Sequence, residues 1–135
     1  MTPKEFAKKW FDTIDAKNYD QLKSMVDAKH TFSNPATPDK LNHEGHIGMI
    51  QGMMSAFSGS HSIEQIISEG EWVVTRGRWI GKHTGEFQGM PASGKPVNFS
   101  FCDVMHVVND KVVEEYMEWN AMTLMVQIGA MPQPA

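Results

Sequence analysis

The stretch GKHTGEFQGMPASGK, residues 81–95, joins the end of a predicted strand to a loop. Residues 71–83 (EWVVTRGRWIGKH) overlap the start of this stretch. They are rich in β-branched and aromatic side chains, which predicts a strand. Gly89, Pro91 and Gly94 then interrupt any regular element, which predicts a loop. With a period of two, one face of this strand carries Val73, Thr75, Trp79 and His83, and the other carries Trp72, Val74, Arg76 and Ile80.

Downstream of this loop the pattern predicts two more strands. Residues 97–108 form the first, Asn109 and Asp110 a two-residue turn, and residues 111–119 the second. Residues 121–128 follow as a short helix.

Upstream of these strands, apolar residues recur with the spacing of a helix. Thr2 and Glu5 form a capping box ahead of apolar residues at positions 6, 10 and 14. A short second helix is expected around residues 22–26, a brief extended stretch at 31–33, and a third helix at 43–57. Helices followed by long strands predict an α+β fold with a curved, mostly antiparallel sheet over three N-terminal helices.

Length and composition limit the class of protein. The 135 residues fit one domain, 1–135. A net charge of −4 without a basic cluster argues against nucleic-acid binding, and no apolar run approaches a membrane span. A single cysteine, Cys102, cannot form an intramolecular disulfide, so we expect a cytoplasmic protein.

Known catalytic and metal motifs are missing from the sequence. His43 and His46 have helical spacing, but no HExxH pattern accompanies them. Nucleophile-elbow, phosphate-loop and dinucleotide motifs do not occur either. We therefore expect neither a metal site nor a cofactor.

Methionines and aromatic residues are the stronger signal. Eleven methionines, four tryptophans and seven phenylalanines suit an adaptable apolar cavity, although they could equally fill an ordinary core. A histidine inside an apolar strand, such as His106, is either a satisfied core residue or a pocket group.

Residues 81–95 closely resemble the G-T-H-x-G-E-x-x-G-x-P-x-[ST]-G-K motif of SnoaL-like polyketide cyclases, also called ester cyclases. Residues 43–45, 69–73 and 127–129 resemble further family motifs in the same order. The resemblance covers about residues 3–130 and implies the nuclear transport factor 2-like (cystatin-like) fold, a cone-shaped α+β barrel that dimerises through its sheet. It also implies a cofactor-independent intramolecular aldol cyclisation, which needs a base for the proton α to a carbonyl and donors for the enolate oxygen.

The sequence departs from this family at the expected acid/base. The family aspartate, seven residues before the glutamine of the closing motif, corresponds to Asn120, and an amide cannot abstract a proton. His106, fourteen residues earlier, matches a pocket histidine of the family. Asp103 lies three residues from His106 and therefore on the opposite strand face.

The turn at Asn109–Asp110 sets a geometric condition. A regular two-residue hairpin pairs His106 with Val113, which turns Asn120 away from His106. A bulge or a longer turn is needed to bring His106 and Asn120 together.

These residues predict a SnoaL-like enzyme that removes a proton α to a carbonyl of a polyketide-like molecule, for aldol-type cyclisation or isomerisation. His106 is the expected base, His83 the reserve, and Asn120 the donor to the carbonyl or enolate oxygen; His83 could instead only bond the following loop. One alternative is a non-catalytic module that binds an apolar ligand or a partner on the same fold, and epoxide hydrolysis using Arg76 or Arg78 ranks last.

The expected partners are a small apolar carbonyl compound and a second copy of the chain. The predicted pocket residues are Trp79, Met53, Met54, Met105, Met117, Tyr116 and Trp119. The apolar face with Trp72, Val74 and Ile80 predicts a homodimer interface.

Overall fold

The computed structural model describes residues 1–133 and contains four helices and six strands within them. They follow in the order α1 (Pro3–Asp15), α2 (Tyr19–Ser24), β1 (Val26–Ser33), β2 (Leu41–Asn42), α3 (His43–Ala56), β3 (Phe57–Glu69), β4 (Trp72–His83), β5 (Pro96–Val108), β6 (Lys111–Trp119) and α4 (Ala121–Gln127).

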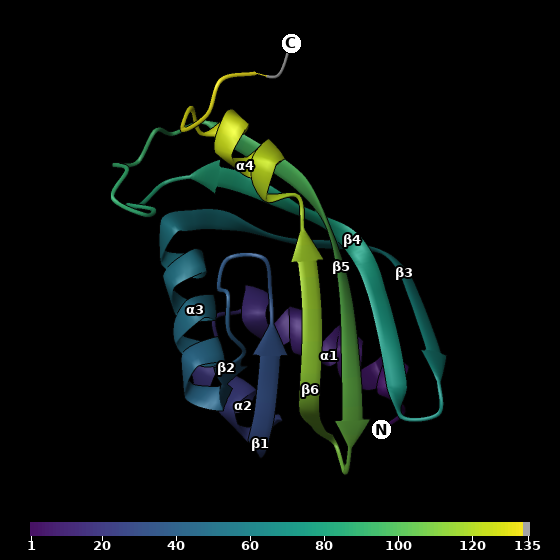
Figure 1. Cartoon of the computed structure of the whole chain (residues 1–135). Coiled ribbons are helices and arrows are strands. Elements are labelled where there is room, and N and C mark those ends of the chain that lie inside the picture. The colour runs from purple at the N-terminus through teal and green to yellow at the C-terminus, as the bar shows by residue number, and fades with distance from the viewer. Residues whose placement is uncertain (134–135) are drawn as a thin grey trace.

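The six strands form one strongly curved sheet in the order β2-β1-β6-β5-β4-β3 (Figure 1). All neighbouring strands are antiparallel except β1 and β6, which are parallel. The sheet stays open, with β2 and β3 at its edges. The α+β prediction is confirmed, because three helices precede the long strands and cover the curved sheet.

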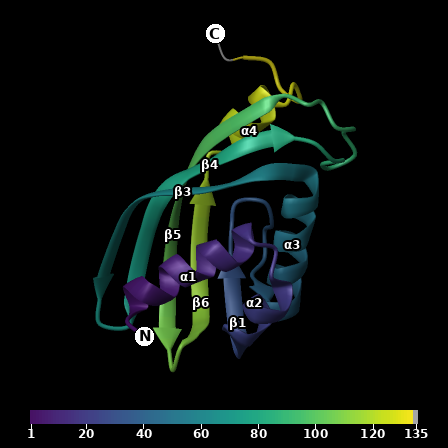
Figure 2. The same cartoon turned by 180° about the vertical axis from the view of Figure 1, so that it is seen from behind.

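Helices α1 and α3 cover the concave face. Figure 2 shows α1 crossing that face, with α3 beside β1. Helix α1 begins as the sequence predicts, since Thr2 and Glu5 each accept a hydrogen bond from the other's backbone N–H. The α1 residues Phe6, Trp10 and Phe11 are fully buried against the sheet, so burial of this apolar stripe fixes the helix on the concave face.

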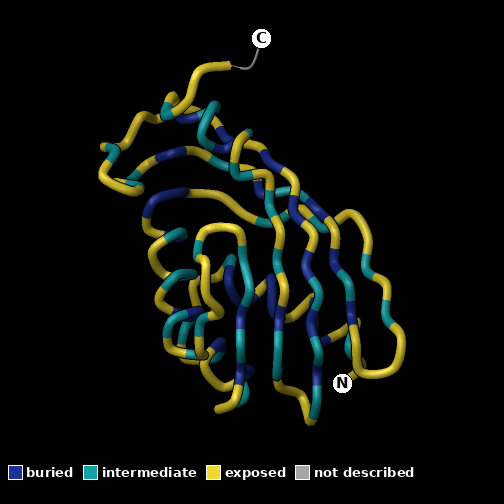
Figure 3. Tube along the Cα trace, in the orientation of Figure 1, coloured by how far each residue is buried: buried dark blue, intermediate teal, exposed yellow. Residues whose placement is uncertain are grey.

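Burial alternates along the strands (Figure 3). On β4, Val73, Thr75, Trp79 and His83 are buried, and these are the residues that the period of two places on one face. The opposite, outer face leaves Trp72 and Ile80 exposed. The predicted division of this strand into two faces is confirmed.

Two strands are longer than the sequence predicts. β1 starts at Val26, in the stretch assigned to the second helix, and it includes His30. β3 starts at Phe57, the residue that the sequence analysis assigns to the end of the third helix. Pairing with β6 and β4 extends both strands, and such long-range pairing leaves no local sequence signal.

The β5–β6 hairpin has the two-residue turn that the sequence predicts. Asn109 and Asp110 have φ of 52° and 58°, as a type I′ turn requires. A bulge follows in β6, because Val107 pairs with Val112 whereas His106 pairs with Glu114. The extra residue shifts every later side chain of β6 to the other face.

No helix within residues 1–133 combines the length and the apolar character needed to cross a membrane.

Candidate functional site

The concave face holds a cavity of about 100 Å³ between α1, α3 and the strands. Its wall consists largely of aromatic, methionine and isoleucine side chains. The apolar lining residues are Trp10, Ile14, Phe32, Met49, Ile50, Met53, Met54, Phe57, Trp79, Phe99, Phe101, Met117 and Trp119.

Three titratable side chains also line this cavity: His46 from α3, His61 from β3 and Glu115 from β6. In an apolar cavity such groups are the ones able to orient a polar ligand atom or to move a proton. They belong to two separate groups of polar residues.

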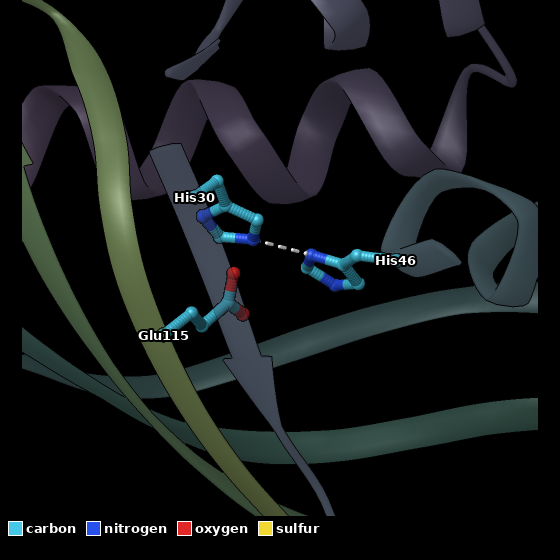
Figure 4. Close-up of side chains that lie close together, drawn as sticks. All are labelled: His30, His46 and Glu115. Carbon is cyan, nitrogen blue, oxygen red and sulfur yellow. Dashed lines mark hydrogen bonds between the residues drawn. The ribbon is translucent and has the colours of Figure 1, made fainter. Parts of the chain in front are cut away.

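The first group is a buried cluster in which His30 of β1, His46 and Glu115 lie side by side (Figure 4). His30 Nε2 and His46 Nδ1 are 2.8 Å apart, and the ligand atoms of the three residues all lie within 4.8 Å of one another. Phe32 stacks on the His46 ring at a centroid distance of 3.5 Å and fixes its plane. Each of the three is at most 3% exposed.

Asp103 of β5 completes the cluster beside Glu115. As carboxylates, neither residue has a hydrogen-bond donor within reach in the described part of the chain. They can bond to each other only when one keeps its proton. The pair is therefore a buried acid dyad.

Burial shifts the pKa values of the whole cluster. It lowers the pKa of His30 to about 4 and that of His46 well below its usual value, with His30 adding to the effect on His46. It raises the pKa of Asp103 to about 7, against the opposing effect of the hydrogen bond with Glu115. Burial and the neighbouring Asp103 raise the pKa of Glu115 well above its usual range. These shifts favour the neutral form of both imidazoles and the protonated form of the Glu115 carboxyl group.

The second group is a dyad formed by His61 and Asp15, the last residue of α1. His61 Nδ1 lies 2.7 Å from Asp15 Oδ1, and the His61 backbone N–H donates to both oxygens at 3.2 and 3.0 Å. Because a carboxylate only accepts, Nδ1 carries the proton and Nε2 keeps its lone pair. Within residues 1–133, His61 Nε2 has no hydrogen-bond partner.

His106 lies away from the cavity. Its ring stacks on Trp72 at 4.5 Å and its Nε2 lies 3.1 Å from Glu71 Oε1, on the outer face of the sheet. The neighbours of His106 along β5, Met105 and Val107, point to the concave side and are buried. His106 is not among the residues that line the cavity.

Asn120 also lies outside the cavity lining. Its side chain accepts from the Thr123 backbone N–H as the N-cap of α4, and its own N–H donates to Ser100. The bulge that the sequence analysis required is present, yet Ser100 is six positions from His106 along β5, about 20 Å at 3.3 Å per residue. The predicted meeting of His106 and Asn120 at a pocket floor is therefore wrong.

His83 anchors the loop that follows it. Its Nδ1 lies 2.8 Å from Ser93 Oγ and accepts from the Ser93 backbone N–H at 3.2 Å. Its backbone pairs with Lys95 and Gly94. The GKHTGEFQGMPASGK stretch is thus a strand end tied to its own loop, and His83 does not line the cavity.

Five of the predicted pocket residues, Trp79, Met53, Met54, Met117 and Trp119, line the cavity. Met105 is buried without reaching it, and Tyr116 is exposed on the outer face. The predicted place of Tyr116 in the pocket is wrong, because Tyr116 pairs with Val104 and shares the outer face of the sheet with His106.

Sequence reasoning missed His30, His61, Glu115 and Asp15. Glu115 carries a weak signal, since it is an acidic residue within an apolar strand. The other three have none, because the contacts join residues that are far apart in the chain: Asp15 and His61 are 46 residues apart, and His30 and His46 are 16 apart.

Comparisons with known proteins bear on the family and the fold of the chain. A family model described as SnoaL-like polyketide cyclase matches residues 4–128. The aklanonic acid methyl ester cyclase DauD of Streptomyces sp. (strain C5) is 26% identical over 96 residues, which is 67% of this chain and 59% of that protein.

Two solved structures share the fold over almost the whole chain. AclR from Streptomyces galilaeus has a TM-score of 0.89 at 19% identity, covering 98% of this chain and 84% of its own. IdmH from Streptomyces antibioticus has a TM-score of 0.86 at 20% identity, covering 96% and 99%.

Proposed function

Because the chain belongs to the SnoaL-like polyketide cyclase family, we propose that it catalyses a cyclisation or isomerisation of a small, largely apolar carbonyl compound. Such a reaction begins with removal of the acidic proton α to a carbonyl group. The proposal rests on one observation above all: an imidazole on the wall of the apolar cavity is oriented by a carboxylate.

His61 is the proposed base. Asp15 holds its Nδ1 at 2.7 Å and accepts its backbone N–H, which fixes both the ring and its tautomer. The Nε2 lone pair is then available to take the substrate proton, and the resulting imidazolium is stabilised by Asp15. Phe11 and Phe101 pack against the ring at 4.9 and 5.4 Å and limit its rotation.

The carbonyl oxygen of the substrate would lie toward His46 and Glu115, the other polar groups on the cavity wall. A donor at this place stabilises the negative charge that develops on the oxygen when the α proton leaves. Burial and the neighbouring Asp103 raise the pKa of Glu115, which favours the protonated carboxyl group that can act as such a donor in the metal-free protein.

The cavity volume limits the substrate. At about 100 Å³ it is smaller than the roughly 300–1,000 Å³ typical of ligand pockets. A compact molecule fits as the side chains stand, whereas a larger ring system requires Met49, Met53 and Met54 to move. Methionine side chains suit this because they are unbranched and flexible.

The test is exchange of α protons in D₂O, followed by NMR, with a panel of β-keto methyl esters and cyclic enones. Wild type should accelerate exchange, and His61→Gln should reduce the rate by about 100-fold or more. His106→Gln is the matched control and should leave the rate unchanged, because His106 lies on the outer face. Ring closure is then followed by mass spectrometry.

A different outcome would favour a ligand-binding module on the same fold. In that case no substrate shows exchange above the buffer rate, while native mass spectrometry still finds an apolar molecule bound. Equal exchange by wild type and His61→Gln would remove His61 from the mechanism.

We also propose that the protein is a homodimer through the outer face of the sheet. Trp72, Ile67 and Ile80 are 38%, 54% and 44% exposed on this face, which is unusually apolar for a solvated sheet. A second copy of the chain would bury the same residues on both sides of a two-fold axis. Light scattering at micromolar concentration measures the mass of the particle and so distinguishes a dimer from a single chain.

A cytoplasmic location is proposed as well. Cys102 is a free, exposed thiol, which is ordinary in a reducing compartment. Fractionation of cells that express the protein at native level tests the location.

A further inference from the structure

The cluster of His30, His46 and Glu115 is unusual for a protein core. Three potential metal ligands from three different elements, β1, α3 and β6, converge within 4.8 Å of one another (Figure 4). All three are buried, and two of them line the cavity. Buried polar side chains normally have hydrogen-bond partners, so such a cluster needs an explanation.

Hydrogen bonds inside the protein account for the cluster only in part. The two imidazoles bond to each other, and Glu115 bonds to Asp103 only when one of the two carboxyl groups keeps its proton. The described chain offers the Glu115 and Asp103 oxygens no other donor.

We propose that His30 Nε2, His46 Nδ1 and the Glu115 carboxylate bind one divalent first-row transition-metal cation, of the class to which Zn²⁺ belongs. Two imidazoles and one carboxylate form a ligand set that such cations prefer. The cation takes the place of the Glu115 proton, which is released to solvent, and gives the carboxylate oxygens a positive partner.

The geometry is close to that of a bound state. With metal–nitrogen bonds of about 2.0–2.1 Å and a tetrahedral angle, two ligand nitrogens lie about 3.4 Å apart. His30 and His46 need to separate by only about 0.6 Å from their 2.8 Å contact. Phe32, stacked on His46, and the paired strands β1 and β6 hold the ligands in place.

Three protein ligands leave at least one coordination position open, and His46 and Glu115 both border the cavity. The open position therefore faces the place where a ligand oxygen would lie. A role for the cation in polarising the carbonyl group whose α proton His61 removes rests on the proposed function. Binding of the cation does not depend on the proposed function.

The test is metal binding by untagged protein that has been stripped with a chelator, using Zn²⁺ in calorimetry and Co²⁺ in absorption spectroscopy. Wild type should bind one cation per chain, and the Co²⁺ spectrum should show nitrogen and oxygen ligands in a low-symmetry site. His46→Gln and Glu115→Gln should each weaken binding by at least about 100-fold, since replacing even outer residues of metal sites costs 10–100-fold.

His106→Gln and Cys102→Ser are the matched controls. The first alters the exposed His106–Glu71 pair and the second the exposed thiol, and neither should change the affinity. Circular dichroism shows whether each variant folds. If the cluster variants do not fold, the anomalous signal of Co²⁺ in a crystal of wild type locates the cation.

No binding by wild type, equal binding by the cluster variants, or an anomalous peak elsewhere would each overturn the proposal. Proton exchange by metal-free protein separates the two proposals. Exchange that persists without metal leaves the role of His61 intact even when the cluster binds no cation. Binding without any exchange supports the metal site alone.

Discussion

The two faces of the sheet carry the same chemical pair, an imidazole beside a carboxylate, in opposite surroundings. On the concave side His61 lies 2.7 Å from Asp15, and the two side chains are 10% and 20% exposed. On the outer side His106 lies 3.1 Å from Glu71, whose side chain is 61% exposed. Only the first pair borders a cavity, so the surroundings rather than the residue types separate a candidate site from a surface contact.

The largest expected difference between the faces is in stability. Phe101 of β5 is 4% exposed and packs on Phe11, so Phe101→Ala should lower the free energy of unfolding by about 3–5 kcal/mol. Tyr116 of β6 is 37% exposed, with Lys40 over its ring, and Tyr116→Ala should cost about 1 kcal/mol or less. Urea denaturation at one protein concentration measures both. Similar losses would mean that the outer face is as tightly packed as the concave face.

The next comparison concerns the two carboxylates. Asp15→Asn places an amide beside His61 Nδ1, and the fixed tautomer is lost, so α-proton exchange should fall by about 100-fold. Glu71→Gln makes the same change on the outer face and should alter exchange by less than about twofold. Asp15→Glu keeps a carboxylate and should restore part of the rate. An unaffected rate in Asp15→Asn would contradict a positioning role for Asp15.

Sequence patterns predicted the two faces of β4 but placed His106 on the cavity side of β5, whereas the buried side of β5 carries Met105 and Val107. The bulge in β6 that the sequence analysis required is present, and the extra residue turns all later side chains of β6 to the other face. A regular hairpin would pair His106 with Val113, whereas the structure pairs it with Glu114. Glu115 thereby faces inward and Tyr116 outward.

The remaining site residues depend on the tertiary fold. His30 lies on β1, whose parallel pairing with β6 joins segments about 80 residues apart, as Phe32 and Glu115 show. Asp15 meets His61 only because α1 crosses the concave face. The strand patterns, the capping box and the two-residue turn at Asn109 and Asp110 are local features, and these the sequence did predict.

A smaller effect tests the outer face as an interface. Ile80 is 44% exposed there, and Ile80→Lys should weaken self-association at least about tenfold, because an interface buries the new charge. Met122→Lys is the matched control, since Met122 is 56% exposed but belongs to α4 and not to a strand of the outer face. Sedimentation over a range of concentrations measures both variants. Identical association of Ile80→Lys and wild type would place the contact elsewhere.

The smallest expected effect is on α3, which covers the concave face with Met53 and Met54 toward the cavity. Gly48 and Gly52 lie in the same helix, and a Cβ at either position would meet no atom within 4 Å. Each change to alanine should therefore raise the free energy of unfolding by about 1 kcal/mol, the difference in helix propensity.

Proton exchange should stay at the wild-type rate in both alanine variants, because neither glycine borders the cavity. Gly77→Ala provides the opposite case in β4. A Cβ there would lie 2.3 Å from the Ser62 carbonyl oxygen, so this variant should be destabilised. Thermal melts of the three variants give the stabilities, and exchange rates give the activity. Slower exchange in a stabilised Gly48→Ala or Gly52→Ala variant would show instead that α3 must bend for substrate to enter, since added rigidity would be the one property that had changed.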